Sequence, residues 1–510
     1  MKTFPKGQQL KIGAILSYLS IAVNIVSGLI YTPWMIRQIG QSHYGLYTLA
    51  NSLITLFLID FGLSSATARY VSKYHAEGNE EKVNNFLGVI YKLYLIIDAV
   101  IFTALLVVFF LIDTIYVKLA PAELQQFKVV YVIAASFAVF NFPFVTQNGV
   151  LTAYEKFIPL KLADLIYRFL IVGFTVVALL LGYGLYALVA VHAIAGLLVI
   201  VYKFIIIKKS VLVKANFKYS DRSLYKDIFG FSIWVTLSSL AQRLVFNITP
   251  SVLGIVANSA AIAVFGVVTV IEGYTYTITT AINGMFMPKI SRIYAHTDTE
   301  SDITPLLLRV GRFQYALNGL LVVGFAIVGK SFIRLWMGVD YLDAYYGILL
   351  VIIPGMFYNA LQIAHTTATV QKKVNLQAYV NIATGLISIT CSFILSKYYG
   401  VIGASIAIFI AYMVRAIALN IVYHKKLELD IPLFAKECYI KMSFPIIIAL
   451  VLGIAMNCLI PDGGWIMLVC KGCIVVAIYL ILIFLLGLKK EEKKNIINKI
   501  KAKNCRRKQL

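Results

Sequence analysis

The stretch IGAILSYLSIAVNIVSGLIYTPWMI, residues 12–36, decides the fold class. It contains no Asp, Glu, Lys or Arg, and its composition is strongly apolar. A helix of about 20 such residues crosses a hydrocarbon layer of about 30 Å, so this run is long enough to span a membrane. It is too long for the core of a signal peptide and lacks a small-residue cleavage site at its end, so we expect a retained helix.

Comparable runs recur along the rest of the chain. The sequence is 60% hydrophobic and only 14% charged, whereas soluble domains are about 45–50% apolar and about 25% charged. We therefore predict an all-α polytopic membrane protein with about fourteen transmembrane helices. The predicted spans are 12–36, 44–67, 87–112, 128–152, 164–182, 184–207, 229–256, 260–287, 313–335, 345–370, 376–396, 401–423, 442–460 and 464–488.

The basic residues set the expected orientation. The net charge is +23, and most of the 46 Lys and Arg residues fall in alternate connections, above all 208–226 and the tail 489–510. Because basic loops stay in the cytoplasm, we expect both termini there, with some basic side chains touching membrane lipid headgroups. No motif for nucleic-acid binding accompanies this charge, so we do not expect a nucleic-acid partner.

Paired landmarks predict an internal repeat. Pro33 precedes Gly40-Gln41-Ser42 as Pro250 precedes Ala257-Asn258-Ser259, and Tyr154-Glu155-Lys156 corresponds to Val370-Gln371-Lys372. The offset contains an even number of spans, so the repeats share an orientation and are related by an axis along the membrane normal. We expect two pseudo-symmetric six-helix lobes plus two C-terminal helices. The expected divisions are 1–207, 208–423, 424–488 and a basic cytoplasmic tail, 489–510. Transporters built from such repeats bind substrate between the halves.

The motifs of the first two spans resemble a known family. They are Leu29-Ile-Tyr-Thr-Pro33, Ile39-Gly-Gln-Ser-His-Tyr-Gly-Leu-Tyr47, Asp60-Phe-Gly-Leu-Ser-Ser-Ala66 and Arg69-Tyr-Val-Ser72. This pattern is similar to bacterial repeat-unit flippases for O-antigen, capsule and exopolysaccharide. They form the polysaccharide-transporter branch of the multidrug/oligosaccharidyl-lipid/polysaccharide superfamily. The fourteen-span plan and the repeat fit that resemblance over essentially the whole chain.

The resemblance implies a function in the bacterial cytoplasmic membrane. Such proteins move an oligosaccharide linked by pyrophosphate to a polyprenol from the cytoplasmic to the outer face, and a polysaccharide polymerase is an implied partner. The chain has no Walker phosphate loop and no HExxH motif, so we expect no enzyme activity, no cofactor and no metal site. A proton or sodium gradient is the expected energy source.

Charged side chains within spans are the candidate site residues, because each is costly unless it is paired or hydrated. Arg243 lies near the middle of its span, flanked by Gln242 and Asn247, and Glu272 lies near the middle of the next. One interpretation is a structural ion pair between Arg243 and Glu272. The other assigns substrate binding to Arg243, Gln242 and Asn247, since an Arg fork suits phosphate oxygens, and ion coupling to Glu272.

Three further charges remain open between site and scaffold. Arg415 has no acidic residue three or four positions away, so it either binds substrate in the cavity or extends toward the inner face. Asp98 is a candidate for ion coupling that faces the cavity. Asp60 is a second coupling candidate, and its structural alternative is hydrogen bonding with the basic loop at Arg69.

Several polar residues are predicted to be structural. Asp164 and Arg168 are spaced i, i+4 and are expected to pair along one helix face. Lys203 lies near an inner end and is expected to extend toward the headgroups. Asn24 stands in the middle of the first span where the cationic cavity of a lipid II flippase would favour Arg, which argues against lipid II as substrate.

Two alternatives to the flippase interpretation remain. One is a multidrug or cation exporter of the same superfamily, although Arg243 and Arg415 disfavour a cavity for cations. The other is a membrane scaffold for polysaccharide assembly without transport.

The Cys470–Cys473 pair has CxxC spacing but no second pair or nearby His, so we expect two buried thiols rather than a metal or redox site.

Overall fold

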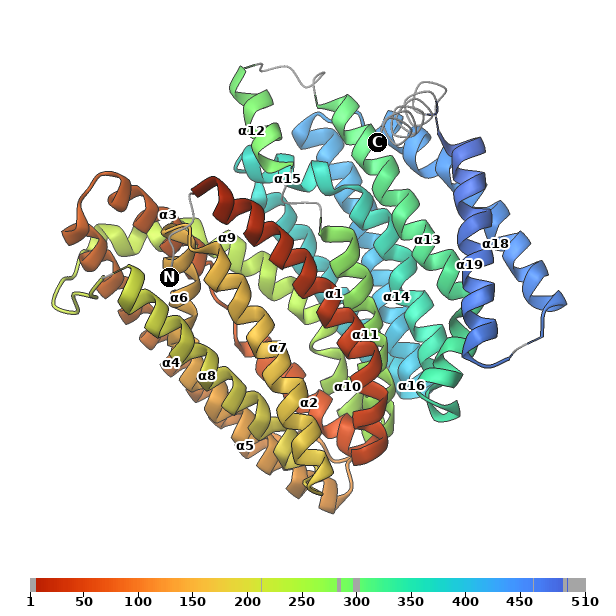
Figure 1. The fold of residues 1–510 in the computed structure, drawn as a ribbon, viewed down its shortest axis with the longest axis horizontal. Coiled ribbons are helices and arrows are strands. Elements are labelled where there is room, and N and C mark those ends of the chain that lie inside the picture. The colour runs from red at the N-terminus through yellow and green to blue at the C-terminus, as the bar shows by residue number, and fades with distance from the viewer. Residues whose placement is uncertain are drawn as a thin grey trace, which may run out of the picture. The chain divides into compact units, whose positions relative to one another are not determined.

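The computed structural model describes residues 6–211, 213–281, 286–296, 303–461, 463–488 and 493. These residues form helices and connecting turns, without a strand among them, which confirms the predicted all-α membrane fold (Figure 1). The predicted basic tail 489–510 lies outside the described residues apart from Lys493. The helices are α1 Lys6–Ile39, α2 Gln41–Phe57, α3 Leu63–Ala76, α4 Glu80–Ile115, α5 Pro121–Asn141, α6 Thr146–Ala153, α7 Phe157–Leu180, α8 Leu185–Ser210, α9 Arg222–Phe246, α10 Thr249–Val256, α11 Ser259–Thr280, α12 Met287–His296, α13 Thr304–Trp336, α14 Asp343–Ala360, α15 Gln362–Val370, α16 Val374–Leu427, α17 Ile431–Phe434, α18 Lys441–Leu459 and α19 Trp465–Leu482.

Twelve helical stretches of the described chain are long and apolar enough to cross a membrane. One difference from the predicted fourteen arises in α16, whose 54 residues contain both predicted spans, 376–396 and 401–423, joined at a kink. The predicted break is present as a kink at Gly400, whose φ of 51° and ψ of −127° are not helical. Glycine allows this conformation because it has no Cβ to clash with the backbone.

The other difference lies in the predicted span 44–67, which is broken into α2 and α3. Phe61 and Gly62 both adopt positive φ angles, 51° and 67°. A bulky residue at positive φ costs about 1–3 kcal/mol, so surrounding contacts must hold the turn. Asp60 supplies them, because its carboxylate accepts hydrogen bonds from the backbone N–H of Ser64 at 3.1 Å and from the Tyr94 hydroxyl.

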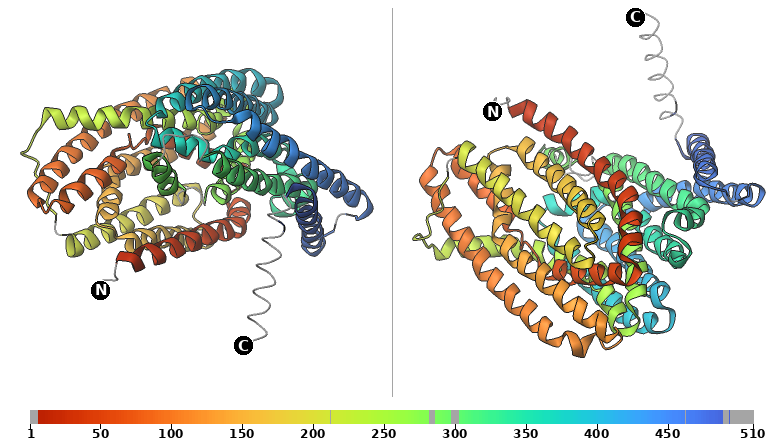
Figure 2. Two further views of the ribbon diagram at one scale, coloured as in Figure 1. Left: turned by 90° about the horizontal axis from the view of Figure 1, so that it is seen from above. Right: turned by 60° about the horizontal axis from the view of Figure 1, so that its bottom comes forward.

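The helices cluster into two compact units. Unit 1 comprises Met1–Val270 and Val374–Ala411, and unit 2 comprises Ile271–Lys373 and Tyr412–Leu510. In unit 1, α7 packs between α1 and α8, and α5 packs between α4 and α8 (Figures 1 and 2). In unit 2, α13 lies at the centre and contacts α14, α18 and α19 (Figure 1).

These units divide the chain elsewhere than the expected lobe boundary at residue 207. Helices α9 and α10 pack against α2, and α9 also contacts α3, so they cluster with unit 1. The side chain of Asn381 donates to Ser238 at 2.9 Å and joins the start of α16 to α9 in the same unit. The division into lobes 1–207 and 208–423 therefore stays a prediction from the sequence repeat.

Two repeat-related serines meet within unit 1. Ser42, at the start of α2, and Ser259, at the start of α11, both donate to Oε1 of Glu123, at 2.5 and 2.6 Å. Gly45 permits this approach, because a Cβ at that position would lie only 2.1 Å from the Ser259 carbonyl oxygen. The two segments that the sequence repeat relates thus share one carboxylate.

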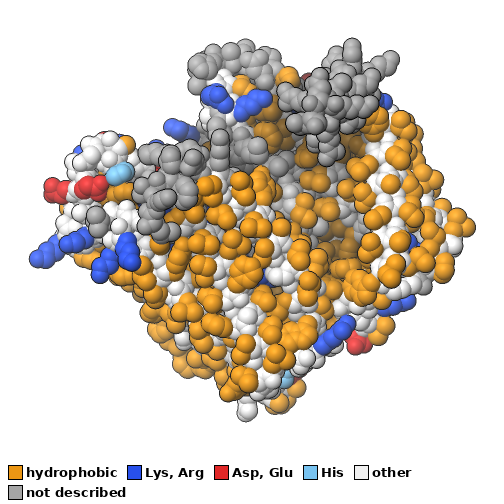
Figure 3. Space-filling model, in the orientation of Figure 1, with side chains coloured by type: hydrophobic (Ala, Val, Ile, Leu, Met, Phe, Trp, Pro, Cys, Tyr) orange, Lys and Arg blue, Asp and Glu red, His pale blue; other side chains and the backbone are white. Residues whose placement is uncertain are grey.

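Large apolar side chains cover much of the helix surface. Hydrophobic groups dominate the face seen in Figure 3, and most of the visible Lys and Arg side chains lie near its edges. Leu459 at the end of α18 is 83% exposed, and Ile466 near the start of α19 is 84% exposed. Exposed apolar helix faces with fully hydrogen-bonded backbones are what a bilayer requires, so the chain is a multi-pass membrane protein.

Candidate functional site

Ionisable side chains line hollows in both units. We call the hollow around Glu272 the unit 2 pocket and the hollow between α1, α7 and α8 the unit 1 cavity. The unit 2 pocket is lined by Glu272, Thr275, Tyr276, Asn318, Leu321, Val322, Val351, Ile352, Gly355, Tyr358, Asn359 and Tyr412. The unit 1 cavity is lined by Ser17, Ser20, Ile21, Asn24, Lys161, Asp164, Leu165, Tyr167, Arg168, Ile171 and His192.

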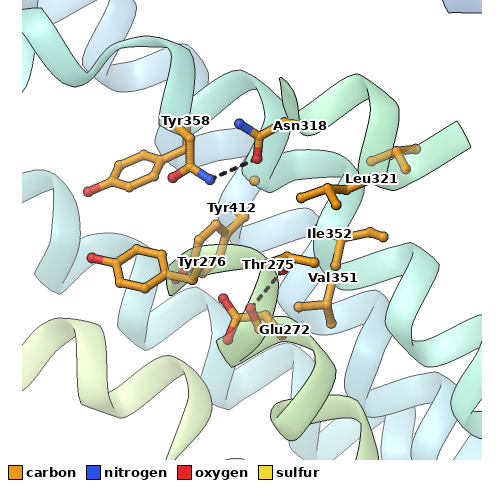
Figure 4. Close-up of a pocket in the computed structure, with 12 residues that line it drawn as sticks. Glu272, Thr275, Tyr276, Asn318, Leu321, Val351, Ile352, Tyr358 and Tyr412 are labelled. Carbon is orange, nitrogen blue, oxygen red and sulfur yellow. Dashed lines mark hydrogen bonds between the residues drawn. The ribbon is translucent and has the colours of Figure 1, made fainter. Parts of the chain in front are cut away.

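The unit 2 pocket places one carboxylate in a narrow space. Glu272 and Asn318 enter it from different helices, with Val351 and Ile352 on a further side (Figure 4). The enclosed space holds about one or two water molecules. The pocket therefore fits a proton, a water or a small ion near Glu272, and it is too small for a sugar.

A chain of amide groups closes the other end of this pocket. The amide of Asn359 donates to Asn318 Oδ1 at 3.1 Å and to the Thr279 hydroxyl at 3.3 Å. Gln314 donates to the Thr279 carbonyl at 2.8 Å. Because the amides of Asn318 and Asn359 are already hydrogen-bonded within the helix bundle, they fix the pocket wall rather than offer free binding groups.

Arg415 lies beside this pocket and is only 1% exposed. Its guanidinium carbon lies 4.4 Å from the centroid of the Tyr358 ring and 5.3 Å from that of Tyr412. Its Nη2 donates to the Tyr358 hydroxyl at 3.1 Å, while its Nε has no hydrogen-bond partner among the described residues. Stacking on two aromatic rings lowers the cost of burying this charge. Tyr412 and Tyr358 also line the pocket that holds Glu272. The predicted site residues Arg415 and Glu272 therefore lie on either side of the same tyrosine wall.

Arg243 has its partners in unit 1. Its guanidinium donates to the Thr55 carbonyl, and Asp60 interacts with it electrostatically. The break after α2 frees that carbonyl, because the Ile59 N–H, which would normally bond to it, bonds to Phe57 instead. Arg243 thus caps the C-terminus of α2, where a helix carries partial negative charge. This contact to a turn of span two could not be read from the sequence.

The remaining predicted site residues lie near this region or on α4. Gln242 and Asn247 are both half-buried, and the backbone N–H of Asn247 bonds to the Arg243 carbonyl at 2.8 Å. The Asp60 carboxylate accepts hydrogen bonds from Tyr94 and Ser64, which lie outside the loop at Arg69. Asp98 is half-buried on α4, and its Oδ1 has no hydrogen-bond partner within the described chain.

The unit 1 cavity contains basic residues that sequence reasoning treated as structural. Arg168 donates from Nε to the Ser27 hydroxyl at 2.9 Å and from Nη2 to the Asn24 carbonyl at 3.3 Å. Asp164 pairs with Lys161 at 3.2 Å, so the predicted Asp164–Arg168 pair was wrong. The helix α7 lies against α1 and offers Arg168 a partner across the interface, which spacing along one helix cannot reveal.

A second hollow adjoins this cavity. It is lined by Phe137, Asn141, Phe144, Val145, Gln147, Asn148, Ala163, Asp164, Tyr167, Gly196, Val199, Ile200 and Lys203, so Asp164 and Tyr167 border both hollows. Lys203 donates to Asn148 Oδ1 at 2.9 Å instead of extending outward as predicted, and it also interacts with Asp164. The signal that could have found this cluster is the placement of Arg168 in the centre of an apolar span.

The described residues contain no group of three or more His, Cys, Asp and Glu side chains with the arrangement of a metal site. Cys470 and Cys473 are free thiols on α19, and both are exposed. The prediction that they are buried was therefore wrong, because α19 turns that face away from α13 and α18. Lys471, between them, is buried instead and donates to Asn457 Oδ1 at 2.8 Å.

The fold is shared with solved membrane transporters. The lipid II flippase MurJ in an inward closed conformation matches with a TM-score of 0.73 at 16% identity, over 92% of this chain and 97% of that chain. An inward-facing multidrug resistance MATE family transporter of the MOP superfamily matches with a TM-score of 0.67 at 14% identity, over 83% and 99%. A MOP superfamily transporter from Pyrococcus furiosus matches with a TM-score of 0.56 at 15% identity, over 81% and 93%. Such low identities show the fold alone.

Sequence comparison adds the family. No curated protein sequence matches the chain. The profile of the family described as polysaccharide biosynthesis protein matches residues 10–294, which is more than half of the chain and covers the motifs of the first two spans. The chain therefore belongs to the polysaccharide biosynthesis protein family.

Proposed function

We propose that this protein is a secondary transporter that flips polyprenyl-pyrophosphate-linked oligosaccharide repeat units from the cytoplasmic to the outer face of the bacterial cytoplasmic membrane. It would work by alternating access and serve the synthesis of a surface polysaccharide such as O-antigen or capsule. The observation that carries the proposal is membership of a polysaccharide biosynthesis family on the fold of a lipid II flippase.

The physical problem explains why such a protein is needed. The prenyl tail is at home in lipid, but sugar hydroxyls and a charged pyrophosphate are costly to bring into hydrocarbon. A hydrated cavity with fixed positive charge lowers that cost. Arg415 disfavours the cation-exporter alternative, because its buried positive charge contacts two tyrosines rather than a carboxylate.

We assign substrate binding to Arg243, Gln242 and Asn247. Arg415, the remaining candidate, is 1% exposed beside a space for about one or two waters, so we assign it to packing in unit 2. Arg243 is only half-buried, so its guanidinium is accessible in addition to its contact with Thr55. A guanidinium that is already held by a backbone carbonyl has less freedom to lose when it binds a phosphate.

We assign ion coupling to Glu272, Asp98 and Asp60, with a proton or sodium ion as the coupled species. Glu272 has the strongest support, since it faces a space of about the size of a water molecule. Asp98 is supported by its unpaired Oδ1, which can accept a proton or contact a cation. Asp60 has less support than the other two, because both of its carboxylate oxygens already accept hydrogen bonds, from Tyr94 and from Ser64.

The direct test is flipping in liposomes. Purified protein is reconstituted into vesicles containing a polyprenyl-pyrophosphate-linked oligosaccharide, and exposure of the sugar on the far leaflet is measured with a membrane-impermeant glycosidase. We expect protein-dependent exposure that increases with an imposed proton or sodium gradient. Absence of flipping by folded protein under either gradient would favour the scaffold alternative, and transport of organic cations instead would favour the exporter.

The site assignment predicts that Arg243→Ala abolishes flipping while insertion is unchanged, and that Arg243→Lys retains part of it. Lys keeps the charge but loses the two-pronged geometry for phosphate oxygens. The matched control is Lys128→Ala in the same unit, since Lys128 pairs with Asp113 at 2.5 Å and lies outside both hollows of unit 1. Normal flipping by Arg243→Ala would remove the substrate-binding role.

A further inference from the structure

The charge balance of the unit 1 hollows is the first observation. Lys161, Arg168 and Lys203 surround a single acidic residue, Asp164, on the membrane helices α7 and α8. Asp164 pairs with Lys161 and interacts with Lys203, so the cluster retains an excess of positive charge. Such an excess within spanning helices is costly unless water or an anion accompanies it.

The second observation is how Arg168 is held. Its Nε and Nη2 bond to neutral oxygens of α1, the Ser27 hydroxyl and the Asn24 carbonyl. Among the described residues, no carboxylate forms an ion pair with it. The guanidinium is therefore oriented by its neighbours while its charge remains uncompensated, which is the state of a preorganised anion-binding group.

The third observation is that the cavity walls are polar and anchored. His192 has both ring nitrogens engaged, one with the Tyr47 hydroxyl at 2.8 Å and one with the Tyr167 hydroxyl at 3.4 Å. Ser20 faces the cavity, and its buried hydroxyl has no partner within the described chain. The space is considerably larger than the unit 2 pocket, so it admits a group of phosphate size together with water.

We propose that the unit 1 cavity is a binding site for the phosphate groups of a lipid diphosphate ester, with Arg168 as the principal donor and Lys161 as its support. This inference rests on the proposed function and deepens it, because it places a phosphate subsite on α1, α7 and α8, apart from Arg243 and Arg415.

A purely structural role for Arg168 is the competing explanation, since its two hydrogen bonds join α7 to α1. The variant Arg168→Gln separates the two roles, because glutamine retains an N–H donor for the oxygens of α1 but lacks the charge. A structural role predicts normal ligand binding once the variant is folded. An anion-binding role predicts weaker binding at unchanged stability.

The experiment measures binding to the full-length protein in nanodiscs of a neutral lipid, without transport. The probes are farnesyl diphosphate, inorganic diphosphate and farnesol, and the readouts are calorimetry and the ligand-induced rise in unfolding temperature. We expect farnesyl diphosphate to bind and farnesol not to bind. Arg168→Gln should lower the affinity for farnesyl diphosphate by about tenfold or more, as expected from the loss of a hydrogen bond to a charged group.

The control is Lys128→Gln, which removes the same charge from the same unit outside the cavity and should leave the affinity within about twofold. Should Arg168→Gln fail to fold, Lys161→Gln carries the test, because it removes a cation and exposes the phosphate to Asp164. Inorganic diphosphate that competes with the lipid shows that the anion is recognised on its own, whereas failure to compete shows that the prenyl chain is also required. Both results support the site if Arg168→Gln lowers lipid binding.

Wild-type protein that fails to bind farnesyl diphosphate, or Arg168→Gln that binds it normally, would overturn the inference. The proposed function is judged separately by flipping in liposomes. Binding without flipping would leave the phosphate subsite standing while the transport proposal fails. If the protein flips the lipid but Arg168→Gln binds farnesyl diphosphate normally, the transport proposal stands and the phosphate subsite fails.

Discussion

The unit 1 cavity and the unit 2 pocket show how the same residue types acquire different roles. In unit 1, Arg168 is held by neutral oxygens at the edge of a wide hollow. In unit 2, Arg415 is buried against two tyrosine rings beside a space for about one or two waters. The comparison teaches that an arginine within a span becomes a binding group or a packing group according to the free volume around it.

The acidic residues differ in the same way. Asp164 is exposed and already paired with Lys161, so it balances charge in the cavity. Glu272 faces a confined space in which a change of protonation has large consequences, since the neighbouring groups are aromatic rings and mutually bonded amides. Unit 1 is therefore suited to a bulky anion, and unit 2 is suited to a proton or a small cation.

Removal of the buried arginine should have the largest effect on stability. Arg415→Ala should destabilise the protein by about 2–5 kcal/mol, because it empties a packed site and loses the contact with both rings. Arg415→Met, which retains volume, should cost much less, since a buried charge is replaced by an apolar chain. The measurement is unfolding of detergent-solubilised protein by heat or denaturant.

The matched change in unit 1 sharpens the comparison. Arg168→Ala should cost only about 1 kcal/mol, because it loses two hydrogen bonds between membrane helices, each worth about 0.6 kcal/mol. Equal losses of stability from Arg415→Ala and Arg168→Ala would mean that the two arginines have the same structural role, and the contrast between the units would fail.

Filling the two hollows should give the next largest effect. Val351→Phe in the unit 2 pocket should destabilise the protein by about 1–3 kcal/mol, because extra atoms in a tightly packed site displace their neighbours. Ser20→Phe in the unit 1 cavity should leave stability nearly unchanged and reduce farnesyl diphosphate binding. Unfolding and calorimetry on both variants check this, and a stable, coupled Val351→Phe protein would contradict the assignment of a confined ion site.

The last expected effect concerns coupling and not stability. Glu272→Gln should lower the stimulation of flipping by an ion gradient about tenfold, within the usual range of coupling free energies of about 1–3 kcal/mol. Flipping down the concentration gradient of the substrate should persist, because the unit 1 cavity is intact. Asp113→Asn, which affects only the pair with Lys128, is the control. Full gradient stimulation in Glu272→Gln protein would remove the coupling role.

The sequence by itself determined the membrane fold, the approximate spans and the family. Each depends on composition over about 20 residues or on local motifs, and burial in lipid leaves little choice but helices. Local patterns also located the kink at Gly400, since a turn between two apolar runs favours glycine. The residues of the unit 2 pocket were partly predictable, because Glu272 and Arg415 are isolated charges in apolar runs.

Only the tertiary structure decided which charges meet. Arg243 contacts a carbonyl that is freed by the break between α2 and α3, and Arg168 contacts α1 instead of Asp164 on its own helix. Both contacts join segments far apart in the chain, and hydropathy carries no information on which helix faces lie together. The volumes of the two hollows depend on the same packing, so the division into a wide cationic cavity and a narrow acidic pocket emerges only from the folded molecule.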